Sequence, residues 1–496
     1  MTLSTLIIGV AIVAAILSAV IHFLKDHENV NFHNLPLSFL QNFVGVLFLF
    51  SGAVKAIDPL GTAFKMEQYF AEFETMFNGT WFSFISGIFP VFAQYALAFS
   101  VLMIVFEIAL GFMVLIGHRK KFTAWAFLLL IIFFTFLTGF TFLTGYVPEG
   151  VNFFDFGGWG SYVSTNMKVT DCGCFGDFLV LEPRTSFLKD VFLLIPGILF
   201  IVFNGKLHEV FAPKMRMILT SVVTVLTLIF CYYNYGMNLP IADFRPFSNG
   251  TDVRTKKQAE IDAANAVEVS GYRITNTKTN KVVEIPVASY LTDIKNYPAE
   301  EGWDKETLEQ IKTEPAIKGT KLSEFTIQGE SAVTYVDVVI PDAPNDTITG
   351  YLANDLVADF GDTTGFKIVN SYQEVEEGDI EASLMADPNY SFMIVAYKLE
   401  KASKTAFKDK INALHKGAEG DGLNFYAVTA SADEVTESFR HDVQAPYVFH
   451  SADDILLKTM IRSAPGIILW KDGKIVQKWH YKKLPSYEAI KAKYMK

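Results

Sequence analysis

Six long apolar segments in the first half of the chain limit what this sequence can fold into. They occupy residues 3–24, 37–57, 91–116, 122–146, 187–204 and 216–235. A helix needs about 20 residues to cross the hydrocarbon core of a bilayer, and each segment is close to that length. Because unpaired backbone groups are costly in lipid, such segments must be helical. The sequence therefore predicts six membrane-spanning helices.

The overall composition agrees with a chain that lies partly in lipid. Hydrophobic residues make up 51% and charged residues 19% of the 496 residues, so the apolar share is above and the charged share below that of ordinary soluble domains. The net charge of −11 gives no general attraction to nucleic acid. No basic residue precedes the first apolar segment and Lys25 follows it, which favours an uncleaved anchor over a cleaved signal peptide.

Basic residues predict how the helices are oriented. The loops at residues 117–121 and 205–216 carry three basic residues each, and positively charged loops stay in the cytoplasm. Six spans then place the N-terminus, residues 147–186 and everything after the sixth segment outside. We therefore expect a protein of the inner (cytoplasmic) membrane whose N-terminus and C-terminal half face the periplasm.

Cys172 and Cys174 have the most specific chemistry in the chain. They are two of only three cysteines and lie in the polar loop before the fifth apolar segment, separated by Gly173. Glycine permits the tight turn that so small a ring needs, and a strained disulfide is easily reduced. The loop is expected on the oxidising side, where disulfides persist. We predict thiol–disulfide exchange at this pair; the alternative is a structural turn with inert cysteines.

The acidic neighbours of the pair suggest how it would work. Asp171 and Asp177 should raise the pKa of the thiols, because a nearby negative charge disfavours the thiolate. A raised pKa slows attack by the reduced form, so the pair suits an acceptor or relay better than a fast nucleophile. Two thiolates without a nearby histidine do not favour zinc, and we predict no metal site.

Polar residues in and near the other apolar segments are further candidates. Glu107, in the third segment, is a functional candidate because charges in lipid are costly; the alternative is an interhelical pair with a polar neighbour. Lys55 and Asp58, at the end of the second segment, suggest an interfacial salt bridge or a cap, with Lys55 snorkelling to the interface. Cys231 is a candidate third thiol, although a small buried hydrophobic residue is the favoured interpretation. The phenylalanine-rich run at 131–142 favours packing or lipid contact over a quinone site.

The C-terminal half begins with irregular patterns and ends with a clear one. A polar helix is expected near 252–268, and alternating segments at 269–290, 332–350 and 365–375 favour strands. The later elements are expected to be a strand at 390–397, a helix at 402–417, a strand at 423–429, helices at 432–440 and 452–461, strands at 466–470 and 475–479, and a helix at 486–495.

The order of these later elements resembles the thioredoxin-like family, with Ser463–Pro465 where that fold keeps its cis-proline loop. The resemblance implies that Ala464 and Pro465 could hold an extended peptide by strand-like pairing. However, residues 398–401 replace the Cys-x-x-Cys of the redox members, and no cysteine follows Cys231. Such a domain cannot exchange disulfides; peptide binding and inert packing remain as alternatives.

The membrane half contains three short motifs: Phe50-Ser51-Gly52 with Lys55 and Asp58-Pro59, Glu107-Ile108-Ala109-Leu110-Gly111, and Cys172-Gly173-Cys174-Phe175-Gly176. In these motifs it resembles the DoxX-like superfamily, and within it the methylamine-utilisation MauE type. The resemblance covers about residues 36–205 and implies a compact four-helix membrane bundle. MauE members are associated with forming disulfides in periplasmic proteins, and DoxX relatives with quinone-linked thiosulfate oxidation.

The patterns together predict a multi-pass α-helical membrane protein. It would contain a four-helix DoxX/MauE-like bundle plus two flanking spans, and an α+β periplasmic ectodomain ending in a thioredoxin-like α/β fold. The expected domains are an N-terminal transmembrane anchor at 1–35, the bundle at 36–205, the sixth span and exit at 206–245, a β-rich periplasmic module at 246–385 and the thioredoxin-like domain at 386–496.

Two functions of different classes follow. The first is an inner-membrane thiol–disulfide relay, in which Cys172 and Cys174 exchange electrons between a periplasmic client and membrane quinone; no cofactor other than quinone is suggested. The second is a non-enzymatic envelope assembly or docking subunit that binds partner proteins through the thioredoxin-like domain. A small-molecule transporter is a weaker third, because the spans show few polar residues that could line a path.

The expected partners are a periplasmic client or envelope complex and the lipid membrane, with no nucleic acid.

The predicted orientation can be tested by thiol labelling. After mild reduction with a membrane-impermeant phosphine, a membrane-impermeant thiol reagent should label Cys172 and Cys174 in intact spheroplasts, because their loop is expected outside. The C172S/C174S variant, which keeps Cys231, measures the background. Labelling that requires prior permeabilisation of the membrane would reverse the orientation.

Overall fold

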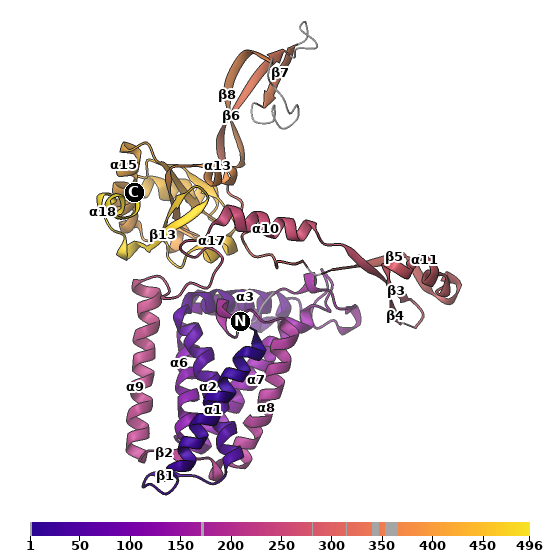
Figure 1. The fold of residues 1–496 in the computed structure, drawn as a ribbon, viewed down its shortest axis with the longest axis vertical. Helices are drawn as coiled ribbons and strands as arrows, with labels where there is room; N and C mark the ends of the chain where they lie inside the picture. The colour runs from indigo at the N-terminus through magenta and orange to yellow at the C-terminus, as the bar shows by residue number, and fades with distance from the viewer. Residues whose placement is uncertain (1, 170–172, 280, 314, 340–346, 353–365) are drawn as a thin grey trace. The chain divides into compact units, whose positions relative to one another are not determined.

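The computed structural model describes residues 2–169, 173–279, 281–313, 315–339, 347–352 and 366–496. The chain forms two compact units, Met1–Arg245 and Pro246–Lys496. In Figure 1 the first unit is a bundle of long helices, and the second contains a sheet flanked by short helices.

The six predicted spans are confirmed as helices long and apolar enough to cross a membrane. They are α1 (Leu3–Phe23), α2 (Leu35–Ile57), α6 (Ala96–Ile116), α7 (Lys120–Thr144), α8 (Pro183–Val202) and α9 (Pro213–Tyr232), the last continued by a π-helical turn to Met237. Pro183 and Pro213 each stand in the first turn of their helix, where the missing N–H breaks no hydrogen bond.

The segment between α2 and α6 forms α3 (Pro59–Phe77), α4 (Ser83–Ser86) and α5 (Ile88–Gln94). Figure 1 shows α3 lying across one end of the bundle. Its Tyr69 hydroxyl is 2.8 Å from that of Thr141 on α7, and Ser100 of α6 donates a 2.7 Å hydrogen bond to the Pro59 carbonyl. These contacts hold α3 against the ends of the spanning helices.

The two basic loops meet at the same end of the bundle. β1 (Val30–Asn31) pairs antiparallel with β2 (Glu209–Val210), and Arg216 donates a 2.7 Å hydrogen bond to the Gly117 carbonyl. Gly117 is left-handed (φ 66°), and a Cβ there would lie 2.0 Å from the carbonyl oxygen of His208. The loop that contains Cys174 lies at the opposite end, because Ser51, near the end of α2, donates a hydrogen bond to the Cys174 carbonyl.

Glycines allow α2 and α6 to pack closely. A Cβ on Gly111 of α6 would lie 2.8 Å from the Cβ of Phe48 and 3.1 Å from the carbonyl oxygen of Gly45, both on α2. Small residues at such contacts let helix backbones approach in a membrane. The register between α2 and α6 is therefore fixed at this point.

The second unit is organised around a mixed sheet with the strand order β13-β12-β9-β10-β11. Its strands are β9 (Tyr390–Val395), β10 (Asn424–Thr429), β11 (Phe449–Ser451), β12 (Gly466–Lys471) and β13 (Lys474–His480). β9, β10 and β11 run parallel, whereas β12 and β13 are antiparallel to their neighbours. Phe392, Ile394, Ile467 and Leu469 are fully buried in its core.

The elements predicted after residue 390 are confirmed to within a few residues at each end. The helices are α14 (Lys404–Ala406), which continues through a π-helical turn into α15 (Asn412–Gly420), then α16 (Asp433–Val443), α17 (Asp454–Met460) and α18 (Tyr487–Tyr494). The short β11 was not predicted from the sequence. The peptide bond between Ala464 and Pro465 is cis.

The region before residue 390 contains two further groups of strands. β3 (Val269–Asn276), β4 (Val282–Pro286) and β5 (Trp303–Lys312) form one sheet in the order β4-β3-β5. β6 (Gln328–Val339), β7 (Thr347–Leu352) and β8 (Lys367–Asp379) extend the main sheet, because Gln328 pairs with Ser451 of β11. The short helices are α10 (Val253–Asn265), α11 (Tyr290–Asp293) and α13 (Glu381–Ala386).

Replacing Gly111 by alanine should destabilise the bundle, because the added Cβ would approach main-chain atoms of α2. Overpacking of this kind costs about 1–3 kcal/mol. The unfolding temperature of the purified protein in detergent measures the effect. Gly9→Ala on α1 is the matched control, since a Cβ there meets nothing within 4 Å. Equal unfolding temperatures for G111A and the unaltered protein would contradict the close approach of α2 and α6.

Candidate functional site

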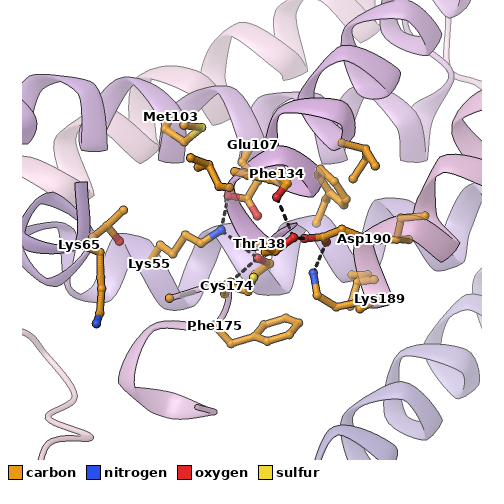
Figure 2. A pocket seen from close by; sticks show the side chains of 18 of the residues that line it. Lys55, Lys65, Met103, Glu107, Phe134, Thr138, Cys174, Phe175, Lys189 and Asp190 are labelled. Carbon is orange, nitrogen blue, oxygen red and sulfur yellow. Dashed lines mark hydrogen bonds and ion pairs between the residues drawn. The ribbon is translucent and has the colours of Figure 1, made fainter. Parts of the chain in front are cut away.

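A cavity of about 70 Å³ lies inside the membrane bundle, beside the loop that carries Cys174. Its walls come from α2, α3, α6, α7 and α8 and from residues 173–175. Several water molecules fit in such a volume, given that one requires roughly 10–15 Å³ by this kind of measure. Figure 2 shows most of the labelled polar side chains close together, whereas Lys65 points away from them. The polar side chains of the lining include Ser51, Lys55, Glu107, Thr138, Cys174, Lys189 and Asp190.

Lys55 and Glu107 form a buried ion pair in the lining of the cavity. The Nζ of Lys55 on α2 lies 2.7 Å from Oε2 of Glu107 on α6, and their side chains are only 6% and 2% exposed. Lys55 also donates a 3.2 Å hydrogen bond to the Ser51 hydroxyl and lies 5.0 Å from the centre of the Phe134 ring. Either charge would be costly without the other at so buried a position.

The contacts of Lys55, Glu107 and Asp58 correct one prediction and show one of the expected arrangements for each of the other two residues. Lys55 does not snorkel to the interface, because its side chain turns into the bundle, where the carboxylate of Glu107 balances it. Glu107 is the member of an interhelical pair that the sequence allowed as an alternative. Asp58 acts as a cap: its carboxylate accepts a 3.0 Å hydrogen bond from the Gly61 N–H at the start of α3.

A second ion pair, which sequence reasoning missed, joins the neighbouring residues Lys189 and Asp190 of α8. Asp190 is 1% exposed and accepts a 3.0 Å hydrogen bond from the Thr138 hydroxyl on α7. Lys189 also lies 5.8 Å from the centre of the Phe175 ring. The available signal was two adjacent charges inside the fifth apolar segment, which is as unusual as one charge at Glu107.

Cys174 lies where the loop meets the cavity. Its carbonyl accepts a 2.8 Å hydrogen bond from Ser51, and its thiol is not paired with Cys231, the other cysteine among the described residues. Gly173 and Gly176 both have positive φ angles, 60° and 50°, a conformation that glycine adopts without steric penalty. The turn they make is closed by the hydrogen bond from Gly176 N–H to the Gly173 carbonyl, 3.1 Å. Phe175, between them, is buried and anchors the loop to the bundle.

The surroundings keep the Cys174 thiol protonated at neutral pH. Burial raises the pKa of the thiol, the positive charge of Lys189 lowers it, and the negative charge of Asp190 raises it again, so that the pKa lies above its usual value. The raised pKa agrees with the sequence prediction. However, its main cause is burial, and the contributing acid is Asp190 on α8 rather than Asp171 or Asp177. A protonated thiol is a slow nucleophile.

Neither of the other two cysteines is seen at the cavity among the described residues. Cys172 and its neighbour Asp171 lie outside the described residues, so the pairing of Cys172 with Cys174 stays a prediction. Cys231 is fully buried on α9, in a cluster with Ala56, Ile104 and Ile108, and it does not line the cavity. This burial agrees with the small hydrophobic residue favoured from the sequence rather than with a third reactive thiol.

The phenylalanine-rich run divides between three environments. Ile131, Phe134 and Leu137 line the cavity, whereas Phe133 and Phe136 are exposed on the outer face of α7. Ile132 is exposed as well, and Phe140 and Phe142 contact the rings of Phe73 and Phe187. The cavity therefore has an apolar aromatic wall, and one ring of it, Phe134, lies beside the Lys55 ammonium. The cavity also contains more polar side chains than we expected when we judged a transport path through the spans to be a weak hypothesis.

The peptide-binding candidates of the second unit are partly occupied by the chain itself. The Ala464 carbonyl accepts a 3.2 Å hydrogen bond from Ser403 N–H, at the start of α14. Pro465 is buried, and its carbonyl accepts a 2.6 Å hydrogen bond from the Ser463 hydroxyl. Residues 399–401, in the stretch where redox relatives have their cysteines, form a 3₁₀ turn with Leu399 buried. The proline loop thus has fewer groups available for a client strand than the resemblance implies.

Among the described residues, no group of three or more His, Cys, Asp and Glu side chains is placed to hold a metal ion. No model of a known protein family matches the chain, and comparisons with curated proteins and with solved structures give no significant match. The argument for function therefore rests on the cavity.

Breaking one partner of the Lys55–Glu107 pair should be more damaging than removing both. Lys55→Met leaves the Glu107 carboxylate buried without its cation, and such single changes cost about 3–5 kcal/mol. The double variant K55M/E107L replaces the pair by apolar groups and should recover most of that loss. Thermal unfolding in detergent measures all three proteins. If the double variant is as unstable as K55M, the two charges do not stabilise each other.

Proposed function

We propose that this protein is a thiol–disulfide relay of the inner membrane, with Cys172 and Cys174 as its exchanging thiols. One observation carries the proposal: Cys174 is held at the edge of a membrane cavity whose walls contain two buried ion pairs. Charged residues inside a membrane are costly and usually mark function. A cysteine kept only for packing would not need them.

The proposed reaction joins Cys172 and Cys174 in a disulfide. The two thiols lose two electrons and two protons, and an acceptor disulfide in a client takes them up as two thiols; the reverse reaction oxidises the client. The raised pKa of Cys174 slows attack by its reduced form on a client disulfide. Asp190, in the lining of the same cavity, is a carboxylate available to accept its proton.

Residues of the cavity also suit a quinone. Phe134 and Leu137 would hold the ring, and Lys55, which has one N–H beyond its bonds to Ser51 and Glu107, would supply a hydrogen-bond donor to a carbonyl oxygen. A bound quinone would provide a lipid-soluble acceptor of two electrons and two protons. The resemblance of residues 36–205 to the DoxX and MauE proteins agrees with such an acceptor.

The proposal places the basic loops in the cytoplasm and the Cys174 loop, with the second unit, in the periplasm. The strand order β11-β10-β9-β12-β13 and the antiparallel pair β12–β13 support a thioredoxin-like fold for the second unit. Because the described second unit contains no cysteine, its contribution would be to hold a client or partner beside the membrane.

Replacing Cys172 or Cys174 by serine should abolish thiol–disulfide exchange with periplasmic proteins. Cys231→Ser is the matched control and should leave exchange unchanged, because Cys231 is buried in a separate cluster. The measurement is the redox state of periplasmic thiols, trapped by alkylation in cells that carry each variant. A further readout is the mixed disulfide expected when only one of the two cysteines remains.

The docking hypothesis predicts a different pattern. If C172S, C174S and C231S all leave periplasmic thiols unchanged while partner proteins still copurify, the relay is wrong and the chain acts as an envelope docking subunit.

A further inference from the structure

A basic groove lies at the end of the bundle opposite Cys174, between the start of α7 and the end of α8. We call it the α7–α8 groove; it is lined by Arg119, Lys120, Lys121, Phe122, Trp125 and Asn204. The lining contains no acidic residue. The groove belongs to neither the cavity nor the thiol loop, so its role is independent of the proposed relay.

The three cations of the groove are not equivalent. Lys120 is engaged by the chain: it donates hydrogen bonds to the carbonyls of Gly205 and Leu207 and lies 3.8 Å from Glu209. Glu209 itself is held more closely by Arg216, at 2.7 Å. Arg119 and Lys121 are exposed, and among the described residues neither has an acidic partner. The groove therefore presents two uncompensated positive charges.

Further along α7 from these cations, the side chains of the groove are apolar and exposed on the outer surface of the bundle. Phe122 and Trp125 are 56% and 50% exposed, and Leu129 continues the same face of α7, since residues three and seven positions apart share a helix face. Ile198 and Val202 are exposed on α8. Tryptophan at the end of a spanning helix is typical of the level of the lipid headgroups.

From this arrangement we propose that the α7–α8 groove binds an anionic phospholipid. The phosphate would lie between Arg119 and Lys121, the indole N–H of Trp125 could donate to an ester carbonyl, and an acyl chain would follow the apolar face of α7. Free inorganic phosphate matches only the cations, and a zwitterionic lipid carries its own positive charge. Only an anionic lipid matches both the charge and the apolar wall.

The test uses the full-length protein in phosphatidylcholine nanodiscs that contain a small fraction of phosphatidylglycerol. One lipid at a time carries brominated acyl chains, which quench nearby tryptophan. The contribution of Trp125 is the difference from the W125F variant. Brominated phosphatidylglycerol should quench Trp125 far more than brominated phosphatidylcholine at equal mole fraction. Each uncompensated cation should contribute roughly fivefold to the preference at low salt.

Charge variants decide whether the groove itself is responsible. R119Q/K121Q should lose the preference for phosphatidylglycerol, whereas R119K/K121R, which keeps both charges, should retain most of it. Lys214→Gln is the matched control, because Lys214 is exposed on the first turn of α9, away from the groove lining. Three results would overturn the proposal: equal quenching by the two brominated lipids, an equal loss of preference in K214Q, or displacement of the lipid effect by millimolar inorganic phosphate.

Discussion

The ion pair between Lys55 and Glu107 is the interaction on which the membrane unit depends. Neither charge is stable in hydrocarbon without the other, so α2 and α6 must meet with these two residues opposite each other. The contact of Gly45 and Gly111 requires the same register. Polar and steric constraints thus agree on a single arrangement of the two helices, which leaves little freedom for alternative packings.

The same pair extends its influence to the loop. Lys55 donates to the Ser51 hydroxyl, and Ser51 donates to the Cys174 carbonyl. A continuous series of contacts therefore runs from the ion pair to the turn that contains Cys174. On the opposite wall, Asp190 is held by Thr138 and Lys189. Cys174 consequently lies in surroundings that raise the pKa of its thiol, which slows attack by the reduced form.

Much of the fold could be predicted because hydrophobic patterns and turn-forming residues are visible in short stretches of sequence. The spans follow from segment length, and the strands and helices after residue 390 follow from apolar runs broken by turn residues. β11 was missed because a strand of three residues is too short to show a pattern. The attachment of β6 to β11 through Gln328 and Ser451 was missed for another reason: pairing between distant strands leaves no local signal.

The sequence by itself determined that this chain crosses a membrane six times, that its basic loops share one end, and that Glu107 and Cys174 are unusual residues in their settings. These properties depend on composition, on the length of the apolar segments and on their even number. None of these requires knowledge of contacts between distant residues. Only the tertiary structure decided that Lys55 faces Glu107, that Lys189 and Asp190 complete the same cavity, and that Cys231 lies in a separate cluster. Lys55 and Glu107 come from helices that are separated in the chain, and packing decides which helix faces meet, because many pairings satisfy the same local pattern.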